Sequence, residues 1–445
     1  MAQNLYPPLW PAYLAANVEK HLGPDVFEFR FMTNRIEDEL ASFKPHIVAI
    51  SSVTQNYNYA IRYARIAKEH GLPVIIGGMH ITSVPDCLTE DMDVGCIGEG
   101  EETFLELMRC FIEYGGFHPE NLAGIKGIVY HDNGKLLRTP DRPVCHSLDQ
   151  LSHPNRSVIG YGYRSYLYTA RGCPFNCVFC ACSRYWGEVR YATAEYVIEE
   201  IRELVENGVK VIRFSDDNFV ANKERLQQIA EMVVANGFHK RVKFSCWCRS
   251  NSVTSGAVKN LKAINVVSVK MGLESGCDRT LQYLKGNVTV KDNWNAVKLF
   301  KSAGIQVNAD FIIGAPDETE EEIMQTYEFI KKAPLALVDI NILSPLPGTP
   351  IWEYAIKRNL VTDDMDWSNL NFKFNDNDAS SVILSERLTH GQLAHIYKKF
   401  ARLRLFKTLK ALPGSPWINE LPGLSLRLLT EKVITFIQRK RKAAS

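Results

Sequence analysis

Hydrophobic positions in the first 115 residues follow two spacings in turn. Short apolar runs typical of buried parallel strands alternate with segments of helical spacing. The predicted strands are residues 25–32, 46–53 and 72–78, and the predicted helices are residues 11–23, 36–44, 59–71 and 101–111. This rhythm predicts an α/β domain with a doubly wound, Rossmann-like parallel sheet. Such domains usually begin with a strand, whereas this chain begins with Pro-rich sequence and a helix, so we expect the first strand to be missing.

A second series of apolar segments begins after a linker that ends near residue 162. Before the linker, residues 125–139 predict a β-hairpin around a Asp132-Asn133-Gly134 turn. The later strands are predicted at residues 165–170, 210–215, 242–247, 266–271, 306–313 and 337–343. Helical segments separate them, and residues 193–208 place Val197, Ile198, Ile201, Leu204 and Val205 on one helix face. Six such units predict a (βα)6 partial TIM barrel, with its chemistry in the loops after the strands.

These patterns divide the chain into three parts. Residues 1–150 form the α/β domain with its hairpin and linker, residues 151–385 the partial barrel, and residues 386–445 a helical, basic C-terminal extension.

The 445 residues are 46% hydrophobic, which is enough for two sizeable cores, and the net charge of +2 gives no indication of nucleic-acid binding.

The basic residues concentrate at the C-terminal end. Residues 400–445 contain ten Lys and Arg against two Asp and Glu. Apolar residues recur there at helical spacing, namely Leu426, Leu429, Val433, Phe436 and Ile437. This pattern indicates either a helix lying on an anionic membrane surface or a helix packed on the barrel.

The chain has the features of a cytoplasmic protein. Its start lacks the basic and apolar regions of a secretory signal, and no run of about 18 apolar residues could span a bilayer. Its 11 cysteines are then not a disulfide framework.

Three cysteines follow the first predicted barrel strand in a C-x3-C-x2-C pattern: Cys173, Cys177 and Cys180. Thiolates favour zinc or iron–sulfur clusters. No second pair of Cys or His completes a zinc shell, and Cys182 is placed to point in a separate direction. Three thiolates on a [4Fe-4S] cluster leave one iron open to a ligand. A zinc knuckle or three buried cysteines are the alternatives.

With Phe179, these cysteines form a C-x3-C-x-Φ-C pattern that strongly resembles the radical SAM superfamily. The resemblance implies a [4Fe-4S] cluster held by the three thiolates, with S-adenosylmethionine (SAM) on the open iron and Phe179 beside its adenine. It also implies an enzyme that forms a 5′-deoxyadenosyl radical and receives an electron from an external flavodoxin- or ferredoxin-type donor.

The resemblance extends to the ends of the following strands. It places Ser215, Asp216 and Asp217 at the SAM amino group and Arg249 at the carboxylate. It places Glu274 at the ribose, and Ile313 and Gly314 at the adenine. Each residue alone also fits a structural role, such as a helix cap for Asp217 or a turn for Gly314. Their joint position at consecutive strand ends favours the SAM site.

The N-terminal pattern resembles the cobalamin-binding domain that precedes many radical SAM enzymes. The contacts that this implies for a corrinoid are Ser51, Ser52, Thr54, Gly77, Gly78, His80, Gly98, Glu99 and Gly100. No D-x-H-x-x-G motif marks a histidine as lower cobalt ligand, so His80 faces cobalt or substrate, or is a hydrogen-bonding group. The alternative is a degenerate domain that only supports the barrel.

Cobalamin beside a radical SAM site favours methylation of an unactivated carbon in a small-molecule or lipid-like metabolite. Radical rearrangement, cyclisation or epimerisation is the alternative, and an iron–sulfur sensing protein is a more distant one. A methylthiotransferase would need a further cysteine trio and a basic β-type appendage for RNA, which this sequence lacks.

Four more cysteines allow two interpretations. Cys246 and Cys248 point the same way along one predicted strand. Together with Cys182 or Cys277 they could contact substrate, donate a hydrogen atom or bind an auxiliary metal. The other interpretation, which needs no further ligands, is that they are small residues inside the barrel.

Overall fold

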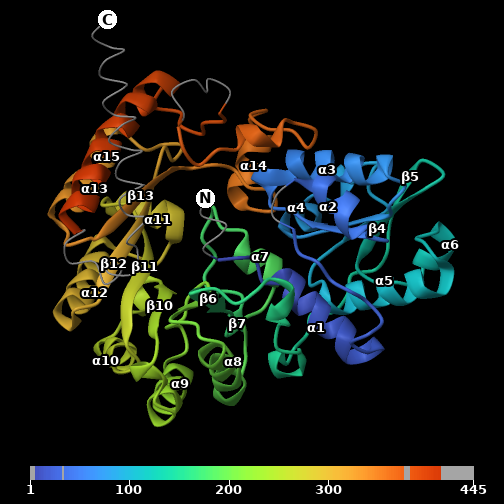
Figure 1. Ribbon diagram of the computed structural model, residues 1–445. Helices are drawn as coiled ribbons and strands as arrows, with labels where there is room; N and C mark the ends of the chain where they lie inside the picture. Colours follow the sequence, from blue (N-terminus) through green and yellow to red (C-terminus); the bar gives the residue numbers. More distant parts are fainter. Residues whose placement is uncertain (1–5, 33–34, 375–380, 412–445) are drawn as a thin grey trace, which may run out of the picture.

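The computed structural model describes residues 6–32, 35–374 and 381–411 and contains two α/β units, each with its own sheet (Figure 1). The N-terminal unit has a five-stranded sheet in the order β1-β2-β3-β4-β5. Its strands are β1 (Val48–Ser51), β2 (Val74–Gly77), β3 (Val94–Cys96), β4 (Ile128–Asp132) and β5 (Lys135–Arg138). Its helices are α1 (Trp10–Leu22), α2 (Ile36–Phe43), α3 (Tyr57–Glu69), α4 (Met79–Ser83), α5 (Glu101–Tyr114) and α6 (Pro119–Leu122).

Strand β2 shows why helices cover both faces of this sheet. Val74 and Ile76 pack with α3 on one face, and Ile75 packs with α1 and α5 on the other. The strands predicted at residues 46–53 and 72–78 are confirmed as β1 and β2, and they are parallel as expected. β3, where no strand was predicted, extends the parallel sheet beside β2. The predicted hairpin is confirmed as β4 and β5, and β4 adds to the sheet by antiparallel pairing with β3.

The prediction of a strand at residues 25–32 is wrong. This segment has no ladder pairing, although Phe27 and Phe29 pack side by side against the core below α1 and α5. The alternation of Phe27 and Phe29 therefore arises because one side of this extended segment is buried, and the segment is not part of the sheet. Helix α1 precedes β1 in the chain, and no described strand lies before β1.

The second unit is a parallel six-stranded sheet in the order β13-β12-β11-β10-β9-β6. The strands are β6 (Arg164–Leu167), β9 (Val211–Phe214), β10 (Lys243–Cys248), β11 (Val266–Glu274), β12 (Gln306–Ile313) and β13 (Leu337–Ile342). All six predicted strands are confirmed. The sheet curves without closing, since β6 and β13 remain its two edges (Figure 1).

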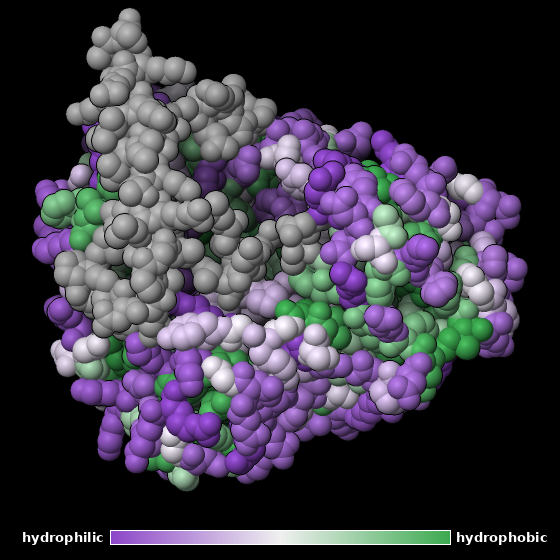
Figure 2. Space-filling model, in the orientation of Figure 1, coloured by the Kyte–Doolittle hydropathy of each residue, from purple (hydrophilic) through white to green (hydrophobic). Residues whose placement is uncertain are grey.

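Helices cover the convex side of this sheet: α8 (Ala194–Glu206), α9 (Lys223–Ala235), α10 (Ser255–Ala263), α12 (Val290–Ala303) and α13 (Glu320–Lys332). The short helix α11 (Asp278–Lys285) follows β11, and its Leu284 lies in a buried cluster with residues of the N-terminal unit. The predicted apolar face of α8 is buried, with Val197, Ile201 and Leu204 each 0% exposed. The outward faces of α8, α9 and α10, at the bottom of Figure 2, are mainly hydrophilic. These helices are therefore amphipathic, as their sequence spacing predicts.

The chain then continues through α14 (Pro350–Ile356) to α15 (His390–Ala411). The apolar and basic positions from Leu426 onward lie outside the described residues. Within the described ranges, no helix is both long and apolar enough to cross a bilayer.

The two units share one hydrophobic core. Ile76 and Ile81 of the N-terminal unit lie in the same buried cluster as Ile312, Trp352 and Trp367 from the C-terminal half. The rings of Trp352 and Trp367 stack with their centroids 5.9 Å apart. This cluster therefore holds the end of β2 in the N-terminal unit close to the end of β12 in the second unit.

Candidate active site

The three cysteines lie in the loop between β6 and α8. A two-residue ribbon, β7 (Ala170–Arg171) and β8 (Arg190–Tyr191), closes the base of this loop, and helix α7 (Cys182–Trp186) follows the cysteines. Gly172 has φ +87°, and a Cβ there would lie 2.6 Å from the carbonyl oxygen of Glu188. The crossing at the loop base therefore requires glycine directly before Cys173.

The three thiols have different environments. Burial raises the pKa of Cys173 to about 11, whereas the Cys182 thiol donates a hydrogen bond that lowers the pKa of Cys180 to about 7. The charges of Cys177 and Cys180 also act on Cys173, so the three are neighbours. In the part of the chain described, no three Cys, His, Asp or Glu side chains already converge on one point. The soft donor set on one short loop nevertheless fits an iron–sulfur cluster.

Arg249, predicted at the SAM carboxylate, contacts the cysteine loop. Its Nη1 donates to Cys177 Sγ at 2.9 Å, and its guanidinium lies over the ring of Phe175, with Cζ 4.0 Å from the ring centroid. The Nη2 atom donates to the carbonyl of Lys285 and Nε to the side chain of Asn251. These contacts hold the Arg249 guanidinium against the side chain of Cys177, between the end of β10 and the cysteine loop.

Asp216, the second of the three residues after β9, uses both carboxylate oxygens for hydrogen bonds to Thr169 and Ala170. One carboxylate oxygen accepts from the backbone N–H of Thr169 at 2.6 Å and of Ala170 at 3.1 Å, and the other accepts from the Thr169 hydroxyl. Asp216 is 2% exposed and holds the start of the cysteine loop. Ser215 accepts from Arg213 Nε at 2.9 Å. Asp217 lies beside the Cys182 thiol, and burial raises the pKa of its carboxyl group.

Glu274 ends β11 in a strained conformation. Its φ is +58°, and the pairing of β11 with β12 shifts register at this point. A non-glycine residue held in this region is typical of a functional position. Burial raises the pKa of Glu274, and its Oε1 lies 3.4 Å from Lys285 Nζ. Because Lys285 also binds Arg249 through its carbonyl, the ends of β10 and β11 are joined.

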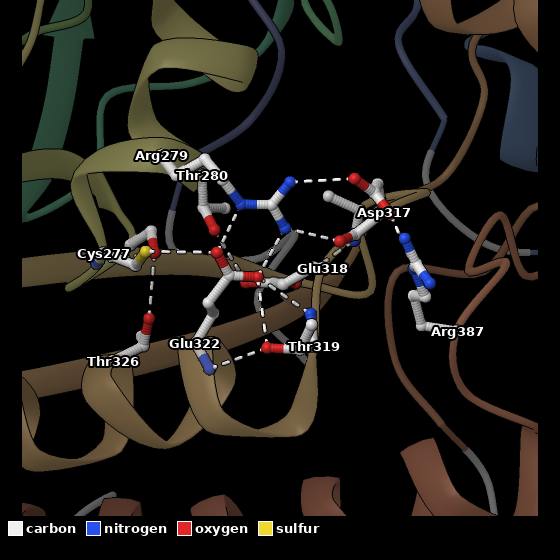
Figure 3. A network of polar contacts seen from close by, with 11 residues as sticks. Cys277, Arg279, Thr280, Asp317, Glu318, Thr319, Glu322, Thr326 and Arg387 are labelled. Atoms are coloured by element: carbon white, nitrogen blue, oxygen red, sulfur yellow. Dashed lines mark hydrogen bonds and ion pairs between the residues drawn. The ribbon is translucent and has the colours of Figure 1, made fainter.

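The loop after β12 is held by the polar network in Figure 3. Gly314 has φ +85°, and its N–H and that of Ala315 donate to Glu318 at 2.8 and 3.2 Å. Arg279 pairs with Asp317 and Glu322 beside this loop. The side chain of Ile313 is 0% exposed and points into the helix-side core, away from the site. Phe179 packs against the core shared by the two units.

The predicted corrinoid contacts meet at the ends of β1 and β2. Gly78 has φ +99°, and a Cβ there would lie 2.7 Å from Ser52 O and 2.8 Å from Ser51 Oγ. Gly77 is the last residue of β2, and Gly100 precedes α5. At the end of β3, Gly98 has φ +78° and open space where a side chain would lie. This cradle of small residues at strand ends fits a bulky ligand.

His80 does not line that cradle. It is 0% exposed, and its ring lies between Tyr57 and Trp367, with centroids 4.1 and 4.5 Å away. Its Nδ1 is 3.2 Å from Thr54 Oγ1, so both residues belong to the shared core. Burial lowers the pKa of His80 to about 4, which keeps the ring neutral.

Glu99, another predicted corrinoid contact, is engaged in ion pairs instead. It pairs with Arg171 at 3.2 Å and with Arg190, and these two arginines lie opposite each other in the β7–β8 ribbon at the base of the cysteine loop. Sequence reasoning missed both arginines and Glu101. The one available signal was the position of Arg171 directly before Gly172 and Cys173.

Of the four further cysteines considered in the sequence, Cys246, Cys248 and Cys277 are buried away from the cysteine loop. Cys246 and Cys248 lie with Sγ atoms 3.7 Å apart in the helix-side core, which supports their interpretation as small core residues. Cys277 is 6% exposed and contacts Glu322 within the network of Figure 3. Cys182 is the exception, because its thiol faces both Cys180 and Asp217.

Two family models match the chain. Residues 2–108 match the B12 binding domain, and residues 167–330 match the radical SAM superfamily. The two matches coincide with the corrinoid cradle and the cysteine loop.

Individual relatives cover most of the chain. It is 33% identical over 378 residues to an uncharacterized methyltransferase of Pyrococcus horikoshii, covering 81% of both chains. It is 27% identical over 437 residues to the anaerobic magnesium-protoporphyrin IX monomethyl ester cyclase of Cereibacter sphaeroides, covering 93% of this chain and 69% of the relative. Its fold is similar to that of the cobalamin-dependent SAM radical enzyme OxsB, with TM-score 0.69, 14% identity, and coverage of 96% and 73%.

Proposed function

Because this chain belongs to the radical SAM superfamily and carries a B12-binding domain, which makes it a cobalamin-dependent radical SAM enzyme, we propose that it methylates an unactivated carbon. The substrate is a small-molecule or lipid-like metabolite, and the electron comes from an external flavodoxin- or ferredoxin-type donor. One observation carries the proposal: Tyr185 Oη of α7, next to the cysteines, donates to the carbonyl of Gly98 at 3.0 Å. The cysteine loop and the corrinoid cradle are thus in direct contact.

In this proposal Cys173, Cys177 and Cys180 hold the cluster, and Arg249 orients the side chain of Cys177 through the 2.9 Å hydrogen bond from its Nη1 to Sγ. When bound, the cluster and SAM supply the radical that removes a substrate hydrogen, and the corrinoid supplies the methyl group. The cradle of Gly77, Gly78 and Gly98 admits the corrinoid close to the backbone.

The residues at the barrel strand ends then bind SAM. Ser215 and Asp217 lie by its amino group and Glu274 by its ribose, since both carboxylates are partly or fully buried beside the cysteine loop. Gly314 lets the backbone approach the adenine, with Phe179 on the other side. Asp216 and Ile313 act indirectly, by holding the loop and filling the core.

The test is cofactor stoichiometry in protein purified anaerobically from cells that import cobalamin. We expect about one corrinoid and about four iron atoms per chain, and deoxyadenosine formation after reduction with SAM. Cys173→Ala, Cys177→Ala and Cys180→Ala should each abolish deoxyadenosine and most bound iron. The matched control is Cys110→Ala, a buried cysteine of α5. Deoxyadenosine formation by any of the three loop variants would refute the cluster assignment.

A second candidate is non-methylating radical chemistry, such as cyclisation. The 27% identity to a cyclase over 93% of this chain favours it. The two candidates differ in one measurement. Incubation with SAM labelled in its methyl group transfers label to product only if the enzyme methylates.

A further inference from the structure

Four buried charged side chains lie together below the cysteine loop: Arg171, Arg190, Glu99 and Glu101. Their side chains are 9%, 3%, 10% and 10% exposed. Arg171 pairs with both carboxylates, at 3.2 Å to Glu99 and more closely to Glu101, and Arg190 pairs with Glu99. We name this group the interdomain clamp.

The clamp joins the base of the cysteine loop to the corrinoid cradle. Arg171 and Arg190 face each other across the ribbon of β7 and β8 that closes the cysteine loop. Glu99 lies between Gly98 and Gly100 of the corrinoid cradle, and Glu101 is the first residue of α5. Every ion pair of the clamp therefore runs from the radical SAM unit to the B12-binding unit.

The charges of the clamp balance. Two guanidinium groups face two carboxylates, and the Arg171 guanidinium also lies 5.1 Å from the Trp186 ring centroid. Burial disfavours the charged form of Glu99, but the hydrogen bond from Arg190 and the charges of both arginines lower its pKa. Removing one member of the group therefore leaves an unpaired buried charge.

Stability alone does not account for ion pairs here. Apolar residues of similar volume usually stabilise a buried contact at least as well as an ion pair does. In addition, the buried apolar cluster already joins the two units. What two-point contacts between guanidinium and carboxylate add is a fixed direction and distance. Transfer between two bound cofactors and one substrate depends on such fixed geometry, because misplacement of about 1 Å costs about 100-fold in rate.

We propose that Arg171, Arg190, Glu99 and Glu101 are positioning residues that set the distance between the cluster and the corrinoid. This inference rests on the proposed function, since it requires both cofactors in one chain. The clamp binds neither cofactor itself. It fixes the cysteine loop against the cradle.

The test compares an Arg171→Met/Arg190→Met/Glu99→Gln/Glu101→Gln variant, the clamp variant, with wild type. The four substitutions remove two positive and two negative charges together, so that no buried charge of the clamp is left without its partner. The matched control is Arg142→Met, which breaks an ion pair of the same helix α5, with Glu106, inside the N-terminal unit. Dipolar electron paramagnetic resonance between cob(II)alamin and the reduced cluster measures their separation.

We expect a single narrow distance distribution for wild type and Arg142→Met, and a broad or shifted one for the clamp variant with iron and corrinoid content retained. An unchanged distribution overturns the inference. Loss of either cofactor from both the clamp variant and the milder Glu101→Gln also overturns it, because the clamp would then serve binding. Wild type without corrinoid refutes the proposed function instead.

A second measurement needs no cofactor. Hydrogen–deuterium exchange of residues 172–189 in the apo chain reports how firmly the cysteine loop is held. We expect exchange about tenfold faster in the clamp variant than in Arg142→Met, because local opening no longer breaks the ion pairs. Equal rates would refute the positioning role even in a chain that binds no corrinoid.

Discussion

Glu318 offers a quantitative test of the loop that follows β12. It is 2% exposed, accepts the N–H groups of Gly314 and Ala315, and lies 3.4 Å from the Thr280 hydroxyl. Burial raises its pKa from 4.5 to about 7. The folded chain therefore holds this proton over a pH range in which the unfolded chain has lost it.

The sign and size of the effect follow from this difference. A raised carboxyl pKa means that the free energy of unfolding is highest below pH 4.5 and falls as the pH rises toward 7. With one pKa unit equal to about 1.4 kcal/mol, the loss from Glu318 is about 0.8 kcal/mol at pH 5 and about 3.3 kcal/mol at pH 8. Glu318→Gln removes this difference of about 2.5 kcal/mol.

The assay is urea unfolding of the apo chain under reducing conditions at pH 5 and pH 8, followed by tryptophan fluorescence. Glu318→Gln should gain stability relative to wild type on going from pH 5 to pH 8. Glu321→Gln, an exposed acid in the first turn of α13, three residues after Glu318, is the control and should follow wild type. Parallel curves for wild type and Glu318→Gln would refute the reasoning.

Three further predictions concern the cradle and the core. Gly78→Ala should lower the free energy of unfolding by about 1–3 kcal/mol and abolish corrinoid binding, because of its positive φ and the contact with Ser52. Gly124→Ala, where no atom lies within 4 Å of the added Cβ and φ is not positive, is the control and should do neither. His80→Phe should leave the corrinoid content and the cob(II)alamin spectrum unchanged, since the ring is enclosed in the shared core. Cys246→Ala should destabilise the fold by about 1–2 kcal/mol and leave the iron content unchanged, whereas loss of iron would place it at a metal site.

The sequence predicted what periodicity encodes. The six barrel strands and the hairpin were identified because their apolar positions and turn residues are local signals. Residues 25–32 show the limit of that method. Phe27 and Phe29 alternate as in a strand, but strand pairing depends on neighbours elsewhere in the chain, and none pairs with this segment.

The site was predictable only where its residues are close in sequence. The cysteine pattern occupies eight positions, so the sequence displays it directly. The partners of Asp216 are Thr169 and Ala170, 47 and 46 positions away, and no spacing rule connects them. In the same way, the ion pair of Arg171 with Glu101 spans 70 positions. Side chains that hold the site in place are therefore found by folding and not by motif.

The apolar core common to both units has a consequence for protein engineering and for descent. Ile76, Ile312 and Trp352 would be separated by any gene fusion that joins the first 150 residues to another barrel. Each half would then expose a surface shaped for its lost partner. Chimeras with other B12-dependent enzymes should fold only if both sides of that contact are exchanged together. We therefore expect the two halves to be inherited as one unit and not as interchangeable modules.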